Sequence, residues 1–167
     1  MVNDVYLGLG SNLGDRLIYL VYAVEFIDSS PNCTLIKASS IYETTPYGQV
    51  EGGNYFNAVI YIKTSLEPDQ LLDLIKQFEL KAGRKSDKKK WGSREIDIDI
   101  LFYNNLIYNN EKLNIPHTEI LLRDFVLIPL QEIAPDLVHP LTNQKIRDIN
   151  QTELEKHIIQ KLNFTLI

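Results

Sequence analysis

The sequence has little of several features that would restrict its function. Cys33 is the single cysteine among 167 residues, so no intrachain disulfide can form and a reducing compartment is compatible. No secretory signal peptide or long apolar run is visible, and we expect a soluble cytoplasmic protein. No repeat, linker or low-complexity stretch interrupts the chain. This predicts a single domain over residues 1–167, with residues 150–167 as a C-terminal extension of undefined role.

Several catalytic motifs are also missing. No Ser-His-Asp set and no Cys/His zinc spacing is present, so neither a covalent nucleophile nor a zinc centre is indicated. The glycine-rich turn at residues 8–14 lacks the Gly-Lys-Ser/Thr ending of a P-loop, and we interpret it as structural. The net charge of -5 argues against general nucleic-acid or anionic-membrane binding. The charge is uneven, however, because residues 84–94 hold six basic side chains and one acidic side chain.

Hydrophobic periodicity predicts alternating strands and helices. Strands are expected at 5–9, 34–42, 55–64 and 96–103, and helices at 17–27 and 68–82, followed by a shorter helical region that ends near 134. This β-α-β-β-α-β order predicts an α+β, ferredoxin-like fold, with a mainly antiparallel sheet and helices packed on one face. A short strand at 106–107 and a helix at 152–161 are further interpretations of weaker patterns.

Asp97 and Asp99 are the most informative residues. They alternate with Ile96, Ile98 and Ile100, so a strand would place both carboxylates on the face opposite the isoleucines. Like charges on one strand face repel, and a cation beside them would relieve that repulsion. Magnesium commonly takes one or two protein carboxylates and completes its shell with water and substrate phosphates. Alone, the pair is also typical of a solvated face, but the adjoining basic segment favours a metal-phosphate site.

Two arginines bracket that basic segment. Arg84 follows a predicted helix and Arg94 precedes the aspartate strand, and the planar guanidinium of arginine suits bidentate contact with phosphate. The lysines at 88–90 are typical of a solvated surface. Trp91 has two interpretations, a core anchor or a stacking surface, and the sequence does not decide between them.

A second candidate site follows the irregular segment at residues 43–54. Tyr55 and Asn57 share one face of the next predicted strand, where a ring and an amide could bind a flat heterocycle. A core tyrosine and a strand-edge asparagine are the plain alternative. His117 and Arg123 likewise read, by themselves, as a loop histidine and a surface base.

The run Lys90-Trp91-Gly92-Ser93-Arg94-Glu95-Ile96-Asp97-Ile98-Asp99-Ile100-Leu101 closely resembles the signature of hydroxymethyl-dihydropterin pyrophosphokinase, a folate-pathway family. The resemblance extends to residues 10–12, 42–48, 55–57, 116–117 and 129–135. It implies transfer of pyrophosphate from ATP to the hydroxymethyl group of a reduced pterin, leaving AMP. ATP and the pterin would be the partners, and magnesium the cofactor.

The resemblance also implies roles for individual residues. Its catalytic set is Arg84, Arg94, Asp97 and Asp99, with the two aspartates as ligands of two magnesium ions. Its ATP-side positions are Glu79, Lys90, Trp91, Arg94, Ile100, Lys112, His117 and Arg123. Its pterin-side positions are Thr44, Thr45, Tyr47, Tyr55, Asn57, Asp97 and Phe125, with Tyr55 and Phe125 as the stacking pair.

The chain departs from the best-known members at a few ATP-side positions. Ser86 and Lys90 replace arginines, and Lys76, Asn114 and Thr118 also differ, which leaves the details of nucleotide contact open. Two other functions are kept as alternatives: a magnesium-dependent nucleotidyltransferase that attacks the α-phosphorus, and a ferredoxin-like RNA-binding module. We expect a monomer, with a dimer as the alternative, and no nucleic-acid or membrane partner.

Overall fold

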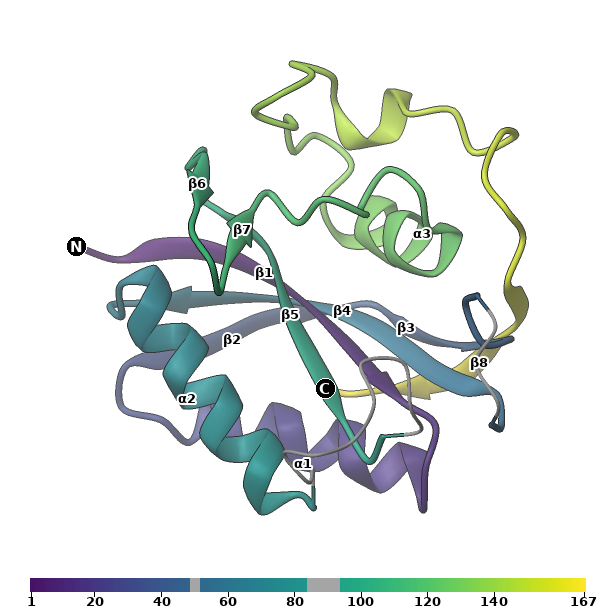
Figure 1. Cartoon of the computed structure of the whole chain (residues 1–167), viewed down its shortest axis with the longest axis horizontal. Helices are drawn as coiled ribbons and strands as arrows, with labels where there is room; N and C mark the ends of the chain where they lie inside the picture. The colour runs from purple at the N-terminus through teal and green to yellow at the C-terminus, as the bar shows by residue number, and fades with distance from the viewer. Residues whose placement is uncertain (49–51, 84–93) are drawn as a thin grey trace.

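The computed structural model describes residues 1–48, 52–83 and 94–167. A main sheet runs in the order β5-β1-β4-β3-β8, with β2 also paired to β4, and every one of these pairs is antiparallel (Figure 1). Its strands are β1 (Asn3–Ser11), β2 (Cys33–Ala38), β3 (Ser40–Thr44), β4 (Tyr55–Thr64), β5 (Asp97–Tyr103) and β8 (Ile158–Thr165). The short strands β6 (Tyr108–Asn109) and β7 (Asn114–Ile115) form a separate hairpin. The predicted ferredoxin-like α+β fold is confirmed.

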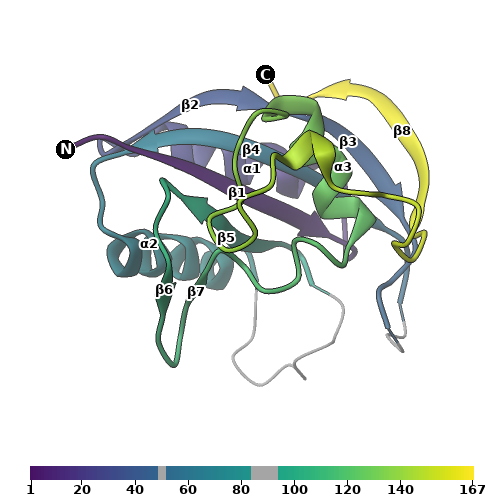
Figure 2. The ribbon, with the colours of Figure 1, turned by 90° about the horizontal axis from the view of Figure 1, so that it is seen from above.

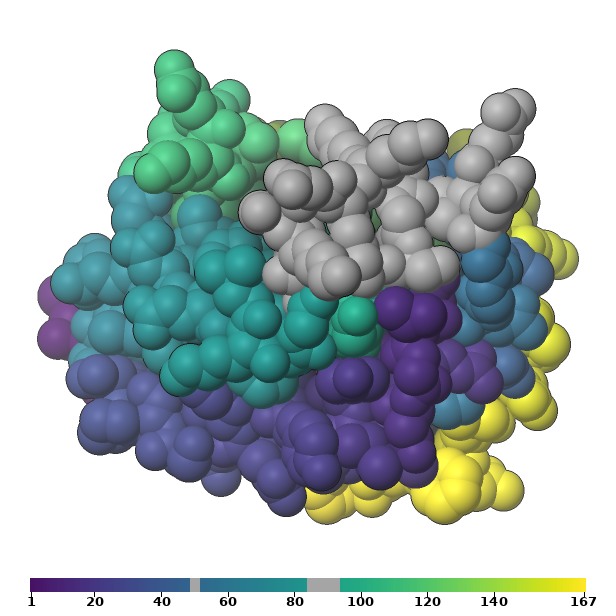
Figure 3. Space-filling view, turned by 60° about the horizontal axis from the view of Figure 1, so that its bottom comes forward, coloured from purple at the N-terminus to yellow at the C-terminus, as the bar shows by residue number. Residues whose placement is uncertain are grey.

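Helices cover both faces of the sheet. Helices α1 (Arg16–Asp28) and α2 (Pro68–Lys81) lie on one face, and α3 (Asp124–Ile133) lies on the other (Figures 1 and 2). Figure 3 views the molecule from the side of α1 and α2. Each face has its own apolar cluster, the larger one beneath α1 and α2 and the smaller one beneath α3. The expectation that the helices share one face was therefore wrong for α3.

Local signals explain where the first two helices begin and end. The Asp15 side chain accepts a hydrogen bond from the Ile18 N–H, which caps α1. Pro68 occupies the first turn of α2, and Gly83, at φ +109°, follows its end. None of the helices in the described part of the chain has the length and hydrophobicity of a membrane-spanning segment.

The predicted strand at 34–42 is divided in two. Ser39 interrupts it, because the Ser39 hydroxyl accepts the Val59 N–H at 2.9 Å while the Ser39 N–H bonds to the Val59 carbonyl at 2.8 Å. One side-chain oxygen thus replaces a backbone acceptor and interrupts the regular ladder to β4 at the junction of β2 and β3.

Two weaker predictions were wrong. The short strand lies at 108–109 and not at 106–107. Residues 152–161 form no helix, since strand β8 begins at Ile158 and pairs with β3 along the edge of the sheet. The segment is polar and has no clear period, so its conformation is determined by long-range contacts such as the pairing with the edge of β3.

Candidate active site

A cleft of about 570 Å³ is lined by residues from β1, β3, β4, β5 and the start of α3. It gathers segments that lie far apart in the sequence. The residues expected in the site that line this cleft are Thr44, Thr45, Tyr47, Tyr55, Asn57, Arg94, Asp97, Asp99, Lys112, His117, Arg123 and Phe125. Of the others, Arg84, Lys90 and Trp91 lie outside the described residues.

Strand β5 brings both aspartates to the cleft, as the alternation predicts. Ile96, Ile98 and Ile100 are buried on the other face, and Asp97 and Asp99 remain partly exposed. Burial, followed by repulsion from Asp97, raises the pKa of Asp99 from 3.8 to about 7. The cleft therefore holds negative charge that is costly without a neutralising partner.

Arg94 lies just before this strand and neutralises part of that charge. Its Nη1 atom lies 2.6 Å from Asp97 Oδ2. The Arg94 backbone is fixed as well, because its N–H donates to Asn12 Oδ1 at 2.7 Å and its carbonyl accepts from the N–H groups of Asn12 and Leu13. A guanidinium held in this way is positioned before any ligand arrives.

Glu79 and Ile100, both expected on the ATP side, do not line the main cleft. The buried Glu79 carboxylate accepts the Ile98 N–H at 2.9 Å and lies 2.8 Å from Lys76 Nζ. Glu79 therefore ties α2 to the backbone of the aspartate strand. Ile100 belongs to the core and borders a smaller recess that Lys76, Asp99 and His117 share with it.

Glycines in β1 keep the region beside the aspartates open. Gly8 pairs with Asp99 and Gly10 pairs with Asp97 across the β1–β5 ladder, and both glycines line the cleft. Directly opposed residues on neighbouring strands project on the same face, so any other residue there would place a side chain beside a carboxylate. A Cβ atom at Gly10 would lie 2.9 Å from Asn57 Oδ1. The sequence analysis missed this role, although glycines two apart in a strand are a usable signal.

The segment before α3 contributes a neutral histidine, His117, and a lysine, Lys112, to the lining of the cleft. The His117 N–H donates to the Leu101 carbonyl at 3.0 Å, and its ring Nδ1 accepts from the Glu119 N–H at 3.3 Å. Burial and the neighbouring charge of Arg123 lower the pKa of His117, so the ring is neutral at pH 7. Lys112 lines the same part of the cleft.

The other end of the cleft is aromatic and closely hydrogen-bonded. Asn57 Nδ2 donates to Thr44 Oγ1 at 2.8 Å, and both side chains are buried. The rings of Tyr47 and Phe125 meet edge to face, with centroids 6.0 Å apart. Burial raises the pKa of Tyr55, which keeps its phenol neutral. This end has the shape and polarity for a flat heterocycle with amide-like edges.

Arg123, expected on the ATP side, contacts the aromatic end. Its guanidinium lies 4.6 Å from the centre of the Tyr47 ring and 5.7 Å from that of Phe125, and it forms an ion pair with Glu119. Burial lowers the pKa of Arg123, although arginine remains charged at neutral pH. Arg123 thus stands between the charged and the aromatic parts of the cleft.

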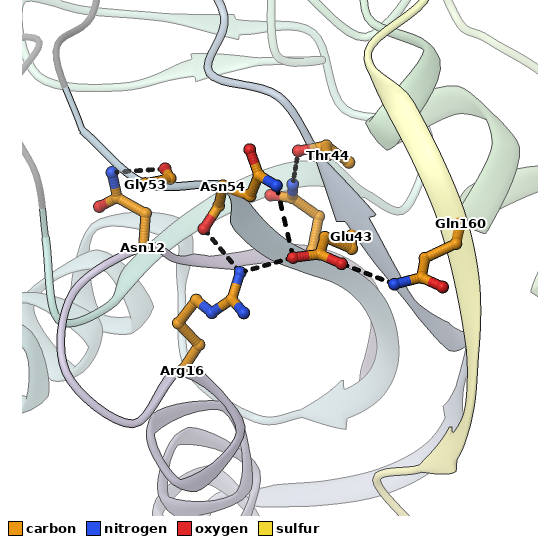
Figure 4. A network of polar contacts seen from close by, with 8 residues as sticks. Asn12, Arg16, Glu43, Thr44, Gly53, Asn54 and Gln160 are labelled. Atoms are coloured by element: carbon orange, nitrogen blue, oxygen red, sulfur yellow. Dashed lines mark hydrogen bonds and ion pairs between the residues drawn. The ribbon is translucent and has the colours of Figure 1, made fainter.

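A polar network braces the outer side of β3 (Figure 4). Arg16 Nη1 contacts Glu43 Oε1 at 3.1 Å and the Asn54 carbonyl at 2.8 Å. Gln160 Nε2 donates to Glu43 Oε2 at 2.7 Å. This network joins α1, β3, β8 and the approach to β4, so it holds in place both strands that carry the residues expected on the pterin side.

The aspartate pair can be tested as a magnesium site from its own chemistry. Among residues 1–48, 52–83 and 94–167, no group of three or more His, Cys, Asp and Glu side chains could hold a metal by itself. Two carboxylates are enough for magnesium when phosphate oxygens and water complete the shell. The pKa of Asp99 is raised by burial first and by repulsion from Asp97 second, and a cation beside the two carboxylates would offset both effects. The residues therefore fit magnesium that arrives together with a phosphate ligand.

Paired carboxylates, a fixed arginine and an aromatic pocket in one cleft define the class of a phosphoryl-transfer enzyme with a heterocyclic acceptor. The family model described as 7,8-dihydro-6-hydroxymethylpterin-pyrophosphokinase (HPPK) matches residues 6–135. The chain belongs to this family.

Two curated relatives named 2-amino-4-hydroxy-6-hydroxymethyldihydropteridine pyrophosphokinase are similar over most of their length. The protein of Aquifex aeolicus is 42% identical over 144 residues, which cover 86% of this chain and 88% of the relative. The protein of Haemophilus influenzae is 40% identical over 158 residues, which cover 95% and 97%, respectively.

Solved structures share the fold at lower identity. The crystal structure of wild-type Plasmodium falciparum HPPK-DHPS with pteroate has a TM-score of 0.69 and 19% identity, covering 88% of this chain. This chain spans 41% of that longer protein, so the likeness concerns one part of it.

Proposed function

We propose that this protein transfers pyrophosphate from ATP to the hydroxyl group of 6-hydroxymethyl-7,8-dihydropterin in folate biosynthesis, releasing AMP. Family membership and relatives with pyrophosphokinase names support the activity. The main structural support is that a single cleft is lined by both charged and pterin-compatible side chains. The charged ones are Asp97, Asp99 and Arg94, and the others are Tyr47 and Asn57. A charged end suits the phosphates, and an aromatic end suits the pterin.

At the β-phosphorus, the reaction forms one P–O bond and breaks another. The pterin hydroxyl oxygen bonds to the β-phosphorus of ATP, and the bond from that phosphorus to the α–β bridging oxygen breaks. AMP leaves with the electron pair of that bond, and the hydroxyl proton is released to water. The chain's main contributions are position and charge. Arg94 faces this region just before β5, and Arg84 is proposed as its counterpart from the family resemblance.

Magnesium fits this assignment. Asp97 and Asp99 would hold two ions, which would supply charge neutralisation to the ATP phosphates. Lys112 and His117 are proposed to hold the nucleotide at the same end of the cleft. His117 is suited to a hydrogen bond and not to a charge contact, because its lowered pKa leaves the ring neutral.

The pterin would lie at the aromatic end. Tyr55 and Phe125 are proposed as the faces against which its rings stack, and Asn57 as the group that reads its amide edge. Thr44 contributes by holding the Asn57 amide at 2.8 Å. Arg123, over the Tyr47 ring, would link pterin binding to the phosphate end.

The direct test incubates the protein with ATP, magnesium and 6-hydroxymethyl-7,8-dihydropterin. We expect AMP to form only when the pterin is present, with phosphorus NMR showing a pterin diphosphate. Pyrophosphate release together with an AMP-linked pterin would instead identify a nucleotidyltransferase. No pterin-dependent AMP would refute the proposal.

The RNA-binding alternative loses support from the fold. Modules of that kind stack bases on an open sheet face, whereas here Val59 and Phe102 are buried in the cluster beneath α3. The single-domain organisation, the monomeric state and the cytoplasmic location stay predictions.

A further inference from the structure

His157, just before β8, lies behind the aromatic end of the cleft. Its side chain is 6% exposed, and its ring Nδ1 lies 3.1 Å from Thr45 Oγ1. The Thr45 N–H also donates to the His157 carbonyl at 2.9 Å. Thr45 lines the cleft and His157 does not, so the histidine acts on the cleft through its neighbour.

The same segment is fixed to the beginning of α3. The buried Asp124 carboxylate accepts the N–H groups of His157 at 2.8 Å and Ile158 at 3.0 Å through one oxygen. Glu155 forms an isolated parallel β-bridge with Arg123. Backbone contacts from residues 155–158 therefore reach both the loop after β3 and the residues that lead into α3.

The His157 ring also completes an aromatic cluster. Its centroid lies 5.2 Å from that of Tyr47 and 5.9 Å from that of Phe125, and both pairs are edge to face. Tyr47 and Phe125 come from the two segments that residues 155–158 join. A ring wedged behind both of them restricts the positions that either ring can take.

We propose that His157 is a positioning residue for the pterin, which fixes Thr45, Tyr47 and Phe125 so that the aromatic end of the cleft is formed before the substrate binds. This inference rests on the proposed function. It assigns a role to the C-terminal segment, which the sequence left undefined. The histidine would set pterin affinity and act little on the nucleotide end, because its ring contacts Thr45, Tyr47 and Phe125 at the aromatic end and otherwise the exposed Glu155.

The test measures binding of the fluorescent probe 6-hydroxymethylpterin in the presence of α,β-methylene-ATP and magnesium, together with binding of the nucleotide analogue alone. His157→Ala removes both the polar contact and the ring, and should weaken pterin binding about tenfold or more. His157→Phe keeps a ring and His157→Asn keeps a polar group near Nδ1, so each should lose only about threefold. Affinity for the nucleotide analogue should change less than about twofold in all three.

Lys161→Ala is the matched control on β8, because Lys161 contacts Glu132 and the Tyr42 ring and does not line the cleft. It should bind the pterin probe normally. Unchanged pterin binding in His157→Ala, equal losses for pterin and nucleotide, or the same loss in Lys161→Ala would overturn the inference. If His157→Ala does not fold, normal pterin binding by both His157→Phe and His157→Asn would overturn it. Failure of the unmodified protein to form pterin-dependent AMP would instead refute the proposed function.

Discussion

The two ends of the cleft are stabilised in different ways. The aromatic end is held by contacts within the protein, including the bond between Asn57 and Thr44 and the ring contact between Tyr47 and Phe125. At the charged end, Asp97 and Asp99 repel each other on one strand. Arg94 pairs with Asp97, and the pKa of Asp99 is still raised by burial and by that repulsion. A neutral heterocycle is recognised by shape, which a protein can build in advance. A metal-phosphate ligand is recognised by charge, which is costly to hold without the ligand.

The largest effect is expected for Asp99→Asn, which should lower the activity and raise the stability of the protein. Turnover should fall at least a thousandfold, about 4 kcal/mol, because one carboxylate of the metal-phosphate site is lost. In chelator, the same variant should be more stable than the unmodified protein near pH 8, by on the order of 2 kcal/mol. Both effects are measurable, by AMP release and by urea unfolding.

The sign of the stability change follows from the pKa of Asp99. Because the folded-state pKa is raised from 3.8 to about 7, folding favours the neutral carboxyl, and stability is lost as pH rises through that window. Asparagine is always neutral, so its advantage should disappear near pH 4. A variant that is less stable at both pH values would contradict the account of the charged end.

Arg94→Ala should lower turnover about a hundredfold or more, roughly 3 kcal/mol, since a guanidinium positioned for the transferring group is removed. Affinity for the pterin probe should change less than about threefold, because the aromatic end keeps its contacts. Steady-state kinetics and probe fluorescence give the two numbers. Equal losses in turnover and pterin affinity would make Arg94 a ground-state binding residue and would weaken the contrast.

Gly10→Ala should damage the aromatic end through sterics alone. The added Cβ would lie 2.9 Å from Asn57 Oδ1 and must displace the amide, so pterin affinity should fall about tenfold. Nucleotide-analogue affinity should fall less than about threefold. The comparison variant is Gly8→Ala, whose Cβ would lie nearest to the Leu101 side chain, at an ordinary contact distance of 3.4 Å, and should cost less pterin affinity. The opposite order of the two glycines would contradict this explanation.

The smallest effect is expected for the polar network around Glu43 on the outer side of β3. Arg16→Ala removes contacts to Glu43 and the Asn54 carbonyl, together with a guanidinium 3.8 Å from the centre of the Phe56 ring. The free energy of unfolding should fall by about 1–2 kcal/mol, as measured in urea, with turnover changed less than about threefold. Arg16→Lys should recover part of the stability. A large loss of turnover at unchanged stability would show that the network takes part in catalysis, and would contradict a purely structural role.

The sequence predicted the parts of the site that depend on local pattern. Alternation along one strand placed Asp97 and Asp99 on the open face, and hydrophobic periodicity placed α1 and α2. The pairing of Gly10 with Asp97 could not be found in this way, because it depends on the register between β1 and β5. The position of His157 depends on a strand that forms only against β3, so its segment showed no pattern of its own.

The structure also shows contacts of two predicted ATP-side residues that the sequence did not indicate. Glu79 was assigned from resemblance, and the structure gives it a backbone partner in β5 that no local pattern contains. Arg123 was placed with the nucleotide, and its guanidinium lies over the Tyr47 ring, which comes from a loop far away in the chain. Contacts of this kind are set by the sheet order and not by the neighbouring residues. Their predicted roles in ATP binding stay predictions.

The floor of the cleft at Gly8 and Gly10 has a consequence for inhibition. A compound resting there would meet backbone atoms, which a point mutation cannot remove. Replacing Gly10 to expel the compound would also push the Asn57 amide, which is proposed to read the substrate. Resistance at this position would therefore carry a cost in substrate use, and the floor is a favourable place to anchor a compound meant to remain effective.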